Sequence, residues 1–132
     1  MTTAIDLTPR VTAPDFGTDP IGYYTWHLLK HPEMYAAFVR YADQYRAVQP
    51  DRRVSADMIC HVLRFQTGLH AKDDTYAVNN VLTPLYARLY RRHRPGANIP
   101  TRTSQLDTLT ESEWAALLAC LPDGVPEREV QA

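Results

Sequence analysis

Twelve of the fourteen basic residues are arginines, and five of these lie between Arg88 and Arg102. A guanidinium group carries a permanent charge and presents its N–H donors as a planar fork, which fits phosphate oxygens or the edge of a guanine base. Arg91 and Arg92 follow Arg88 by three and four residues, so a helix would place all three on one outer face. The spacing therefore predicts an anion-binding surface, with DNA as the first candidate.

The residues around this helix extend the same chemistry. The segment 98–104 is expected to be extended and carries Arg102 among hydroxyl side chains, like a wing that contacts the DNA backbone or minor groove. Arg52 and Arg53 would add positive field. The predicted DNA-binding residues are Arg88, Arg91, Arg92, Arg102, Arg64, Asn79, Asn80 and Thr101.

Charge is distributed unevenly along the chain, although the formal net charge is only -1. Residues 1–45 have a net charge of -2, residues 46–102 of +6, and residues 103–132 of -5. The nearly neutral total therefore hides a basic middle segment and an acidic tail. A basic middle segment favours a polyanionic partner.

A structural interpretation of the same arginines also stands. Cations near the C-terminal end of a helix stabilise its dipole and keep the surface solvated. Acids follow closely in the sequence, and pairing of Arg88 and Arg92 with Asp107, Glu111 or Glu113 would neutralise the basic face. The question is therefore whether these arginines face solvent together or face the chain's own acids.

Five helices are expected to position these residues. Asp19-Pro20 is an N-cap followed by a first-turn proline, and Ser55 is a second N-cap. Gly68 is a C-terminal stop, and the T-E-S-E run from Thr110 is a capping box. The predicted helices are 20–30, 32–48, 55–67, 81–94 and 111–120, with short β segments at 52–54 and 75–78.

Apolar side chains recur at three- and four-residue steps, which indicates helices with one buried stripe each. The expected core stripe of helix 55–67 consists of Met58, Ile59, Val62 and Leu63. That of helix 81–94 consists of Leu82, Leu85, Tyr86 and Leu89.

The fold class predicted from these elements is mainly α: a compact helical domain of about five helices with short β segments. The element order is also compatible with a modified winged helix-turn-helix. However, about twelve residues join helices 55–67 and 81–94, whereas the helix-turn-helix joint needs three or four. The predicted organisation is a flexible N-terminal arm (1–18), a single helical domain (19–121) and a frayed acidic tail (122–132).

Catalytic and metal-binding motifs are not apparent. His27 and His31 have H-x-x-x-H spacing, but Pro32 interrupts the helix beside them and no glutamate lies between. Cys60 and Cys120 match no zinc or redox spacing and fit a reducing compartment. We therefore expect a non-enzymatic, cytoplasmic protein with no cofactor, no metal and no membrane association.

Two further binding modes remain open. An exposed patch of Tyr23, Tyr24 and Trp26, with the acidic tail, would suit a protein partner such as a host factor. The competing interpretation is that these rings pack against helix 32–48. A homodimer held by Trp114, Leu117 and Leu118 is compatible with either function.

Four segments carry a family resemblance: residues 31–45, 54–68, 76–95 and 99–104. Together they resemble a group of small, largely uncharacterised proteins of actinobacteria, other bacteria and their phages, with an F-K-(I/L)-N-N turn, a Y-A-R helix and a final T-R. Here the Y-A-R tripeptide is Tyr86-Ala87-Arg88, whereas Ala77 stands where the pattern has lysine. The resemblance implies a phage or prophage setting, and it covers about residues 20–104.

Overall fold

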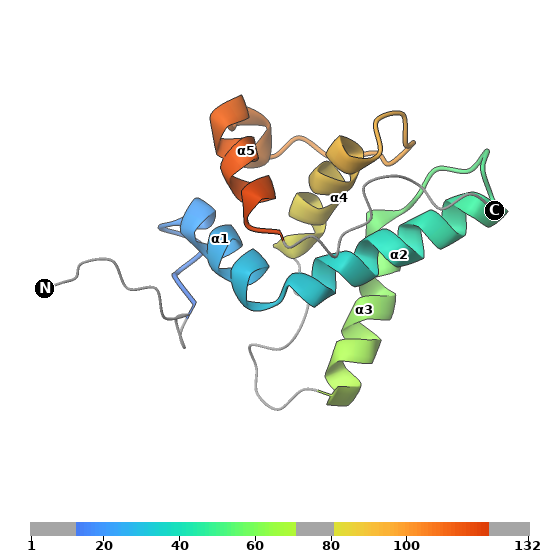
Figure 1. The fold of residues 1–132 in the computed structure, drawn as a ribbon, viewed down its shortest axis with the longest axis horizontal. Helices are drawn as coiled ribbons and strands as arrows, with labels where there is room; N and C mark the ends of the chain where they lie inside the picture. The colour runs from blue at the N-terminus through green and yellow to red at the C-terminus, as the bar shows by residue number, and fades with distance from the viewer. Residues whose placement is uncertain (1–12, 71–80, 122–132) are drawn as a thin grey trace, which may run out of the picture.

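The computed structural model describes residues 13–70 and 81–121, which form a mainly α-helical fold. Figure 1 shows α2 lying across the molecule, with α1 and α5 at one end and α3 extending away from the other helices. A single 3-10 turn, η1, precedes the last helix. The elements are α1 (Pro20–Lys30), α2 (Pro32–Val48), α3 (Ala56–His70), α4 (Leu82–His93), η1 (Gln105–Thr108) and α5 (Glu111–Ala119).

Local signals account for most of the helix boundaries. The Asp19 carboxylate accepts a hydrogen bond from the Gly22 backbone N–H at 2.9 Å, which caps α1. A Cβ at Gly22 would stand only 2.1 Å from that carboxylate, so a larger residue here would displace the Asp19 side chain from this position. Prolines occupy the first turns of α1 and α2, where their missing N–H costs nothing. The predicted helices 20–30 and 32–48 are confirmed.

α3 is longer than its sequence indicated. Its start agrees with the prediction, because the Ser55 hydroxyl accepts from the Met58 N–H at 3.1 Å. The predicted stop at Gly68 is wrong, since α3 continues through this residue to His70. Gly68 does not adopt the positive φ of a helix-ending glycine, which in the described residues occurs only at Gly96 (φ +98°).

α4 forms the centre of the fold. All its residues from Leu82 to Tyr90 are buried except the half-buried Pro84, and α4 contacts both α2 and α3. Tyr86 packs edge-on against Tyr35 and Phe38 of α2, with ring centroids 5.3 and 5.4 Å apart. A helix enclosed on nearly all sides belongs to the core rather than the surface.

The predicted β segments are absent where they can be assessed. Residues 52–54 and 98–104 form no strand, and one backbone hydrogen bond (Val54 N–H to Asn98 carbonyl, 2.8 Å) joins them. Because segment 98–104 has no strand partner, it is not a wing, and nothing in residues 13–70 or 81–121 supports a winged helix-turn-helix. The segment predicted at 75–78 lies outside the described residues.

The aromatic patch predicted on α1 is largely core. Tyr24 and Trp26 are buried, and Tyr23 is half-buried. Phe16 packs edge-on against Tyr23 and Tyr24, so residues 13–18 of the predicted arm include a docked aromatic ring. The competing interpretation, packing within the chain, is therefore correct for the two buried rings.

The α5 stripe is also internal. Trp114 and Leu117 are buried in the core cluster, and Leu118 is half-buried against it. These side chains serve the fold of one chain. The homodimer surface predicted on them is therefore not available.

A buried ion pair fixes the end of α4 to α2. The Arg94 guanidinium donates to both carboxylate oxygens of Asp43, at 3.1 and 2.7 Å, and the Tyr90 hydroxyl donates to the same carboxylate at 2.6 Å. The Arg94 side chain is 1% exposed and that of Asp43 is 5%. Charges removed so completely from water are tolerated only when such partners satisfy them.

We predict that Arg94→Leu lowers the free energy of unfolding by about 3–5 kcal/mol, because it leaves the Asp43 carboxylate buried without its cation. Denaturant unfolding followed by circular dichroism measures the change. The double variant Asp43→Leu/Arg94→Leu should recover much of the loss, since no charge then remains buried. Equal stability of Arg94→Leu and the exposed control Arg40→Leu would contradict this role.

A buried histidine makes stability depend on pH. His27 Nε2 and the Tyr86 hydroxyl are hydrogen-bonded at 2.5 Å inside the core. Burial, with a smaller effect from His31, lowers the pKa of His27 to about 3. The folded state thus keeps this imidazole neutral while the unfolded chain protonates it near its ordinary pKa of about 6.5. Stability from His27 is complete above that pH and falls as the pH drops toward 3.

We predict a loss of about 1.4 kcal/mol per pH unit below pH ~6 from His27 alone. Unfolding measured between pH 6 and 5 should show at least this slope, because burial also lowers the pKa of His93, while the carboxylates with lowered pKa stay ionised there. His27→Gln retains a hydrogen-bonding group and should flatten the slope. His61→Gln, at an exposed position of α3, is the matched control and should leave it unchanged.

Candidate functional site

The three arginines of α4 do not share one outer face. Arg88 is buried, with only 5% of its surface exposed, whereas Arg91 and Arg92 are exposed. The prediction that all three point outward together is therefore wrong for Arg88. The chain after α4 folds back over this part of the helix and covers Arg88, but it leaves Arg91 and Arg92 exposed.

The Arg88 guanidinium is hydrogen-bonded entirely within the chain. It donates to both carboxylate oxygens of Asp107 (3.0 and 3.3 Å), to the Pro84 carbonyl (3.0 Å) and to the Arg102 carbonyl (2.6 Å). Hydrogen bonds from Arg88 and from the Ser104 backbone hold the pKa of Asp107 below its usual value. Arg88 thus joins α4 to segment 102–107, with four of its five N–H donors used within the chain.

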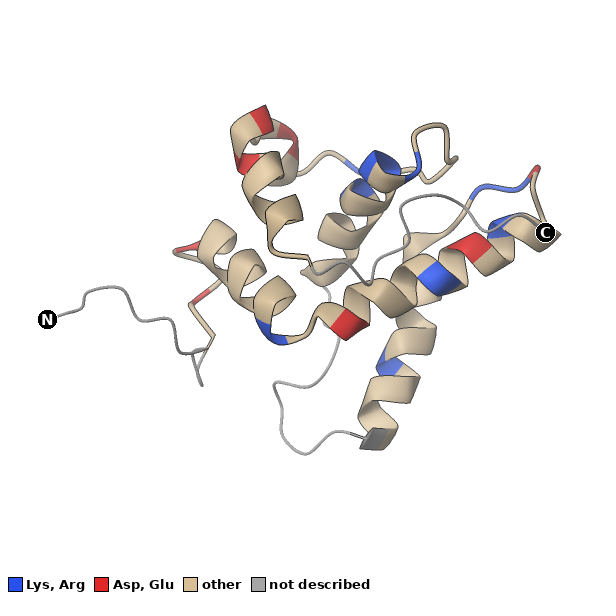
Figure 2. Cartoon of the chain, viewed as in Figure 1, with Lys and Arg blue, Asp and Glu red and all other residues tan. Residues whose placement is uncertain are grey.

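Arg92 is neutralised at the surface. Its guanidinium donates to both carboxylate oxygens of Glu111 (3.0 and 2.9 Å) and lies over the Trp114 ring, 4.6 Å from its centroid. These hydrogen bonds lower the pKa of Glu111, so the carboxylate remains ionised to lower pH. Figure 2 shows the acidic first turn of α5 beside the basic end of α4. The pairing alternative is thus correct for Arg88 and Arg92.

Hydrogen bonds to neutral groups hold the Arg91 side chain in place. Its guanidinium donates to the Ile99 carbonyl at 2.8 Å and to the Thr101 hydroxyl at 3.1 Å. Both acceptors are neutral, and within the described residues Arg91 makes no direct ion pair, although its charge is felt by the nearby Asp107 carboxylate. Arg91 therefore contributes positive field beside segment 98–104.

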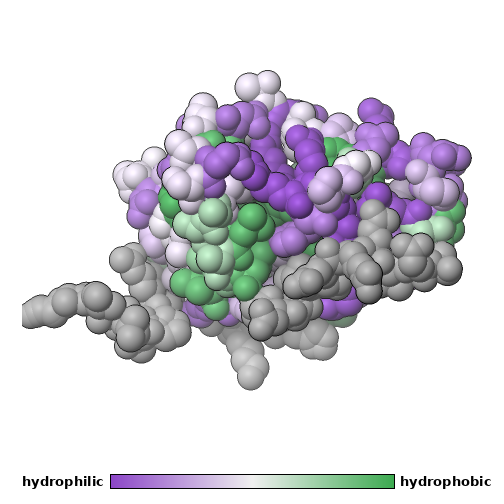
Figure 3. Space-filling view, turned by 45° about the horizontal axis from the view of Figure 1, so that its top comes forward, coloured by the Kyte–Doolittle hydropathy of each residue, from purple (hydrophilic) through white to green (hydrophobic). Residues whose placement is uncertain are grey.

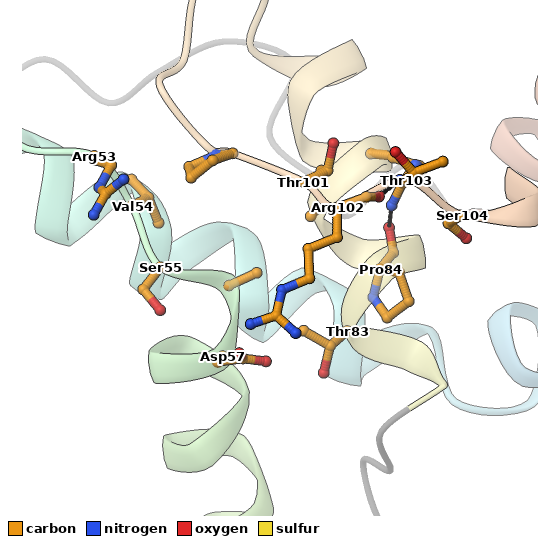
Figure 4. A pocket seen from close by; sticks show the side chains of 14 residues that line it. Arg53, Val54, Ser55, Asp57, Thr83, Pro84, Thr101, Arg102, Thr103 and Ser104 are labelled. Atoms are coloured by element: carbon orange, nitrogen blue, oxygen red, sulfur yellow. Dashed lines mark hydrogen bonds between the residues drawn. The ribbon is translucent and has the colours of Figure 1, made fainter. Parts of the chain in front are cut away.

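A groove of about 700 Å³ lies between the start of α3, the first turns of α4 and segment 100–104. Figure 4 shows Arg102 extending from its segment toward Asp57 and Thr83 on the opposite wall. Buried Arg88 forms part of the lining, and hydroxyl side chains add hydrogen-bonding groups. The hydroxyl-bearing lining residues are Ser55, Thr83, Thr101, Thr103 and Ser104.

Two cations of this groove lack partners. Within the described ranges, neither Arg53 nor Arg102 makes an ion pair or a side-chain hydrogen bond, and both are exposed. The one lining carboxylate, Asp57, forms no ion pair with Arg102 at 4.0 Å or less. Figure 3 shows hydrophilic side chains over most of the face that carries segment 98–104, with a hydrophobic area toward α1 and α5.

The other predicted site residues do not converge on the groove. Arg64 is half-buried and donates to His61 on its own helix at 3.2 Å. Asn79 and Asn80 lie outside the described residues. Arg52 is exposed next to Arg53. Of the predicted site residues, the groove brings together Arg88, Arg102 and Thr101.

Ser55, Asp57 and Thr83 were missed as members of a site, although Ser55 was identified as a helix cap. The adjacent pair Arg52-Arg53 followed by that cap was the available signal: a cation beside a helix N-terminus, where backbone N–H groups favour anions.

Comparison with known protein families, characterised proteins and solved structures found no match to this chain. None of the described helices has the length and apolarity needed to cross a membrane. Among the same residues, no group of three or more histidine, cysteine, aspartate or glutamate side chains is placed to hold a metal ion.

We predict different effects for two arginines one helical turn apart. Arg88→Ala should lower the free energy of unfolding by about 2–3 kcal/mol, because the buried guanidinium and its part-buried hydrogen bonds to the Pro84 and Arg102 carbonyls are lost. Arg92→Ala should leave stability close to that of the wild type, since its pair with Glu111 is exposed and screened by water. Chemical denaturation of both variants in one buffer tests the contrast, and equal losses would contradict it.

Proposed function

We propose that this chain is a non-enzymatic DNA-binding protein of phage or prophage type that holds the phosphate backbone at the Arg53/Arg102 groove. The observation that supports the proposal is that the guanidinium groups of Arg53 and Arg102 line one groove and make no ion pair within the described residues. Arg91 adds a third exposed cation through its contact with Thr101, and it makes no direct ion pair within the described residues. Guanidinium forks and hydroxyl donors are the groups that proteins direct at phosphate oxygens.

The geometry favours phosphate contacts over base readout. Major-groove recognition needs a helix whose side chains protrude toward base edges, whereas α4 is enclosed by α2, α3 and the returning chain. The proposed binding is therefore largely independent of DNA sequence and strongly dependent on salt. Asp57, which lines the same groove, repels phosphate and limits affinity.

A protein partner is the second candidate. The surfaces first considered for it are unsuitable or undescribed, because Tyr24 and Trp26 are buried and residues 122–132 lie outside the described ranges. A different observation favours such a partner: α3 exposes large apolar side chains. Pull-down from a host lysate with and without nuclease separates a partner bound through DNA from one bound directly.

We predict that the protein binds duplexes of unrelated sequence with similar affinity at low salt. Fluorescence anisotropy over a salt series gives the slope of log K against log[salt]. Arg53→Ala/Arg102→Ala should weaken binding and flatten this slope by about two, because each phosphate contact contributes about one. Asp57→Asn should strengthen binding, since it removes the repelling carboxylate.

Matched controls lie on the exposed side of α2. Arg40→Ala removes one exposed arginine, and Glu33→Gln removes one exposed carboxylate, neither of them in the groove. Each should change affinity less than its groove counterpart. Absence of wild-type binding at low salt would reject DNA as the partner, and equal effects of Arg40→Ala and Arg102→Ala would reject this groove as the site.

A further inference from the structure

α3 is apolar on two sides, and only one side faces the core. Ile59, Cys60 and Leu63 are buried against the other helices. On the opposite side, four large apolar side chains are exposed: Met58 (38%), Val62 (40%), Phe65 (69%) and Leu69 (64%). The predicted core stripe was therefore wrong for Met58 and Val62. We call these four residues the α3 stripe.

The α3 stripe has the spacing of a helix-pairing seam. Its members are separated by four, three and four residues, the repeat that keeps side chains on one line of a helix and allows packing against a second helix. α3 extends away from the other helices toward its C-terminal end, so the stripe is accessible to a partner (Figure 1). The other large exposed apolar residues, Leu29 and Val48, lie on different helices.

The spacing reads the same in both directions, which suits a second copy of the same helix in antiparallel orientation. In the register centred between positions 62 and 65, Val62 faces Phe65 of the second copy, and Met58 faces Leu69 of the second copy. Each large side chain then meets a smaller or more flexible one, as close packing requires. A two-fold axis makes both contacts occur twice.

The borders of the seam carry little charge. His61, Gln66 and Gly68 carry none when the imidazole is neutral, and the Arg64 guanidinium beside them is hydrogen-bonded to His61 at 3.2 Å. A Cβ at Gly68 would meet nothing within 4 Å, so a second helix has space to approach there. No lysine, arginine, aspartate or glutamate lies on the line of the stripe itself.

The apolar area matches a weak dimer. At their exposures the four side chains offer roughly 400 Å² per copy, a patch as large as the largest on a typical monomer. Two such patches with their borders give on the order of 1,000 Å² in total, which is the lower end of specific interfaces. Weak, concentration-dependent association is therefore expected.

We propose that the α3 stripe is a homodimer interface in which two α3 helices pack antiparallel about a two-fold axis. The occupant is a second copy of this chain. This inference is independent of DNA binding, because none of the four stripe residues lines the groove.

Sedimentation equilibrium of the full chain tests the dimer. The wild type should rise from its monomer mass of 15.0 kDa toward twice that value as concentration increases. Val62→Lys and Phe65→Glu, both at exposed positions, should each remain monomeric with unchanged circular dichroism. Val48→Lys places the same charge on an exposed valine of α2 and should dimerise like the wild type.

Mixing the two monomeric variants tests the orientation. In the antiparallel register, the ammonium group introduced at position 62 faces the carboxylate introduced at position 65, while the remaining Val62 and Phe65 still pack together. The mixture should therefore form a heterodimer that neither variant forms alone. A parallel register places like positions opposite each other and gives no such rescue.

Each other outcome rejects part or all of the proposal. A wild type that stays at monomer mass up to millimolar concentration overturns the dimer, and the stripe then belongs to a different partner. A dimer that persists in both Val62→Lys and Phe65→Glu overturns the interface. Dissociation of both variants without rescue on mixing overturns the antiparallel arrangement.

Discussion

A charged side chain in the middle of a buried helix constrains everything that follows it in the chain. α4 is central, and Arg88 points from it into the protein rather than into water. Its guanidinium must be satisfied, and the acceptors are the Arg102 carbonyl, the Pro84 carbonyl and the Asp107 carboxylate. The returning chain is thereby fixed against α4 and becomes one wall of the groove.

The same constraint explains why neighbouring arginines differ in role. The hydrogen bonds of Arg88 hold segment 102–107 against α4. With the chain held there, Glu111 lies beside Arg92 and the Ile99 carbonyl lies beside Arg91. The Arg102 carbonyl accepts a hydrogen bond from Arg88, while the Arg102 guanidinium extends into the groove (Figure 4). Some arginines of this region are thus held in ion pairs within the chain, as Arg88 and Arg92 are, whereas Arg102 has no ion pair within the described residues.

Sequence reasoning succeeded where the determinant is local. Caps and first-turn prolines placed α1 and α2 at their observed limits, and the capping box of Thr110 with Glu113 marks the start of α5. It failed at Gly68, where nothing in the fold ends the helix.

Other features depended on contacts distant in sequence. The burial of Arg88 depends on residues 14 and 19 positions further along the chain. Whether Met58 and Val62 or the opposite side of α3 faces the core cannot be read from periodicity, because both sides are apolar. The segment 98–104 was read as a wing because its extended composition does not reveal that it lacks a strand partner.

The groove starts at the first turn of α3, and this location acquires meaning once two α3 helices lie antiparallel. At 1.5 Å per residue, Ser55 is roughly 13 Å from the midpoint of the stripe along the helix. Two grooves would then open about 25–30 Å apart, somewhat less than one turn of B-DNA at about 34 Å. A single duplex that contacts both grooves of a dimer would be bound bivalently. The first contact raises the effective concentration of DNA at the second groove, so two weak contacts would give tighter binding without additional arginines.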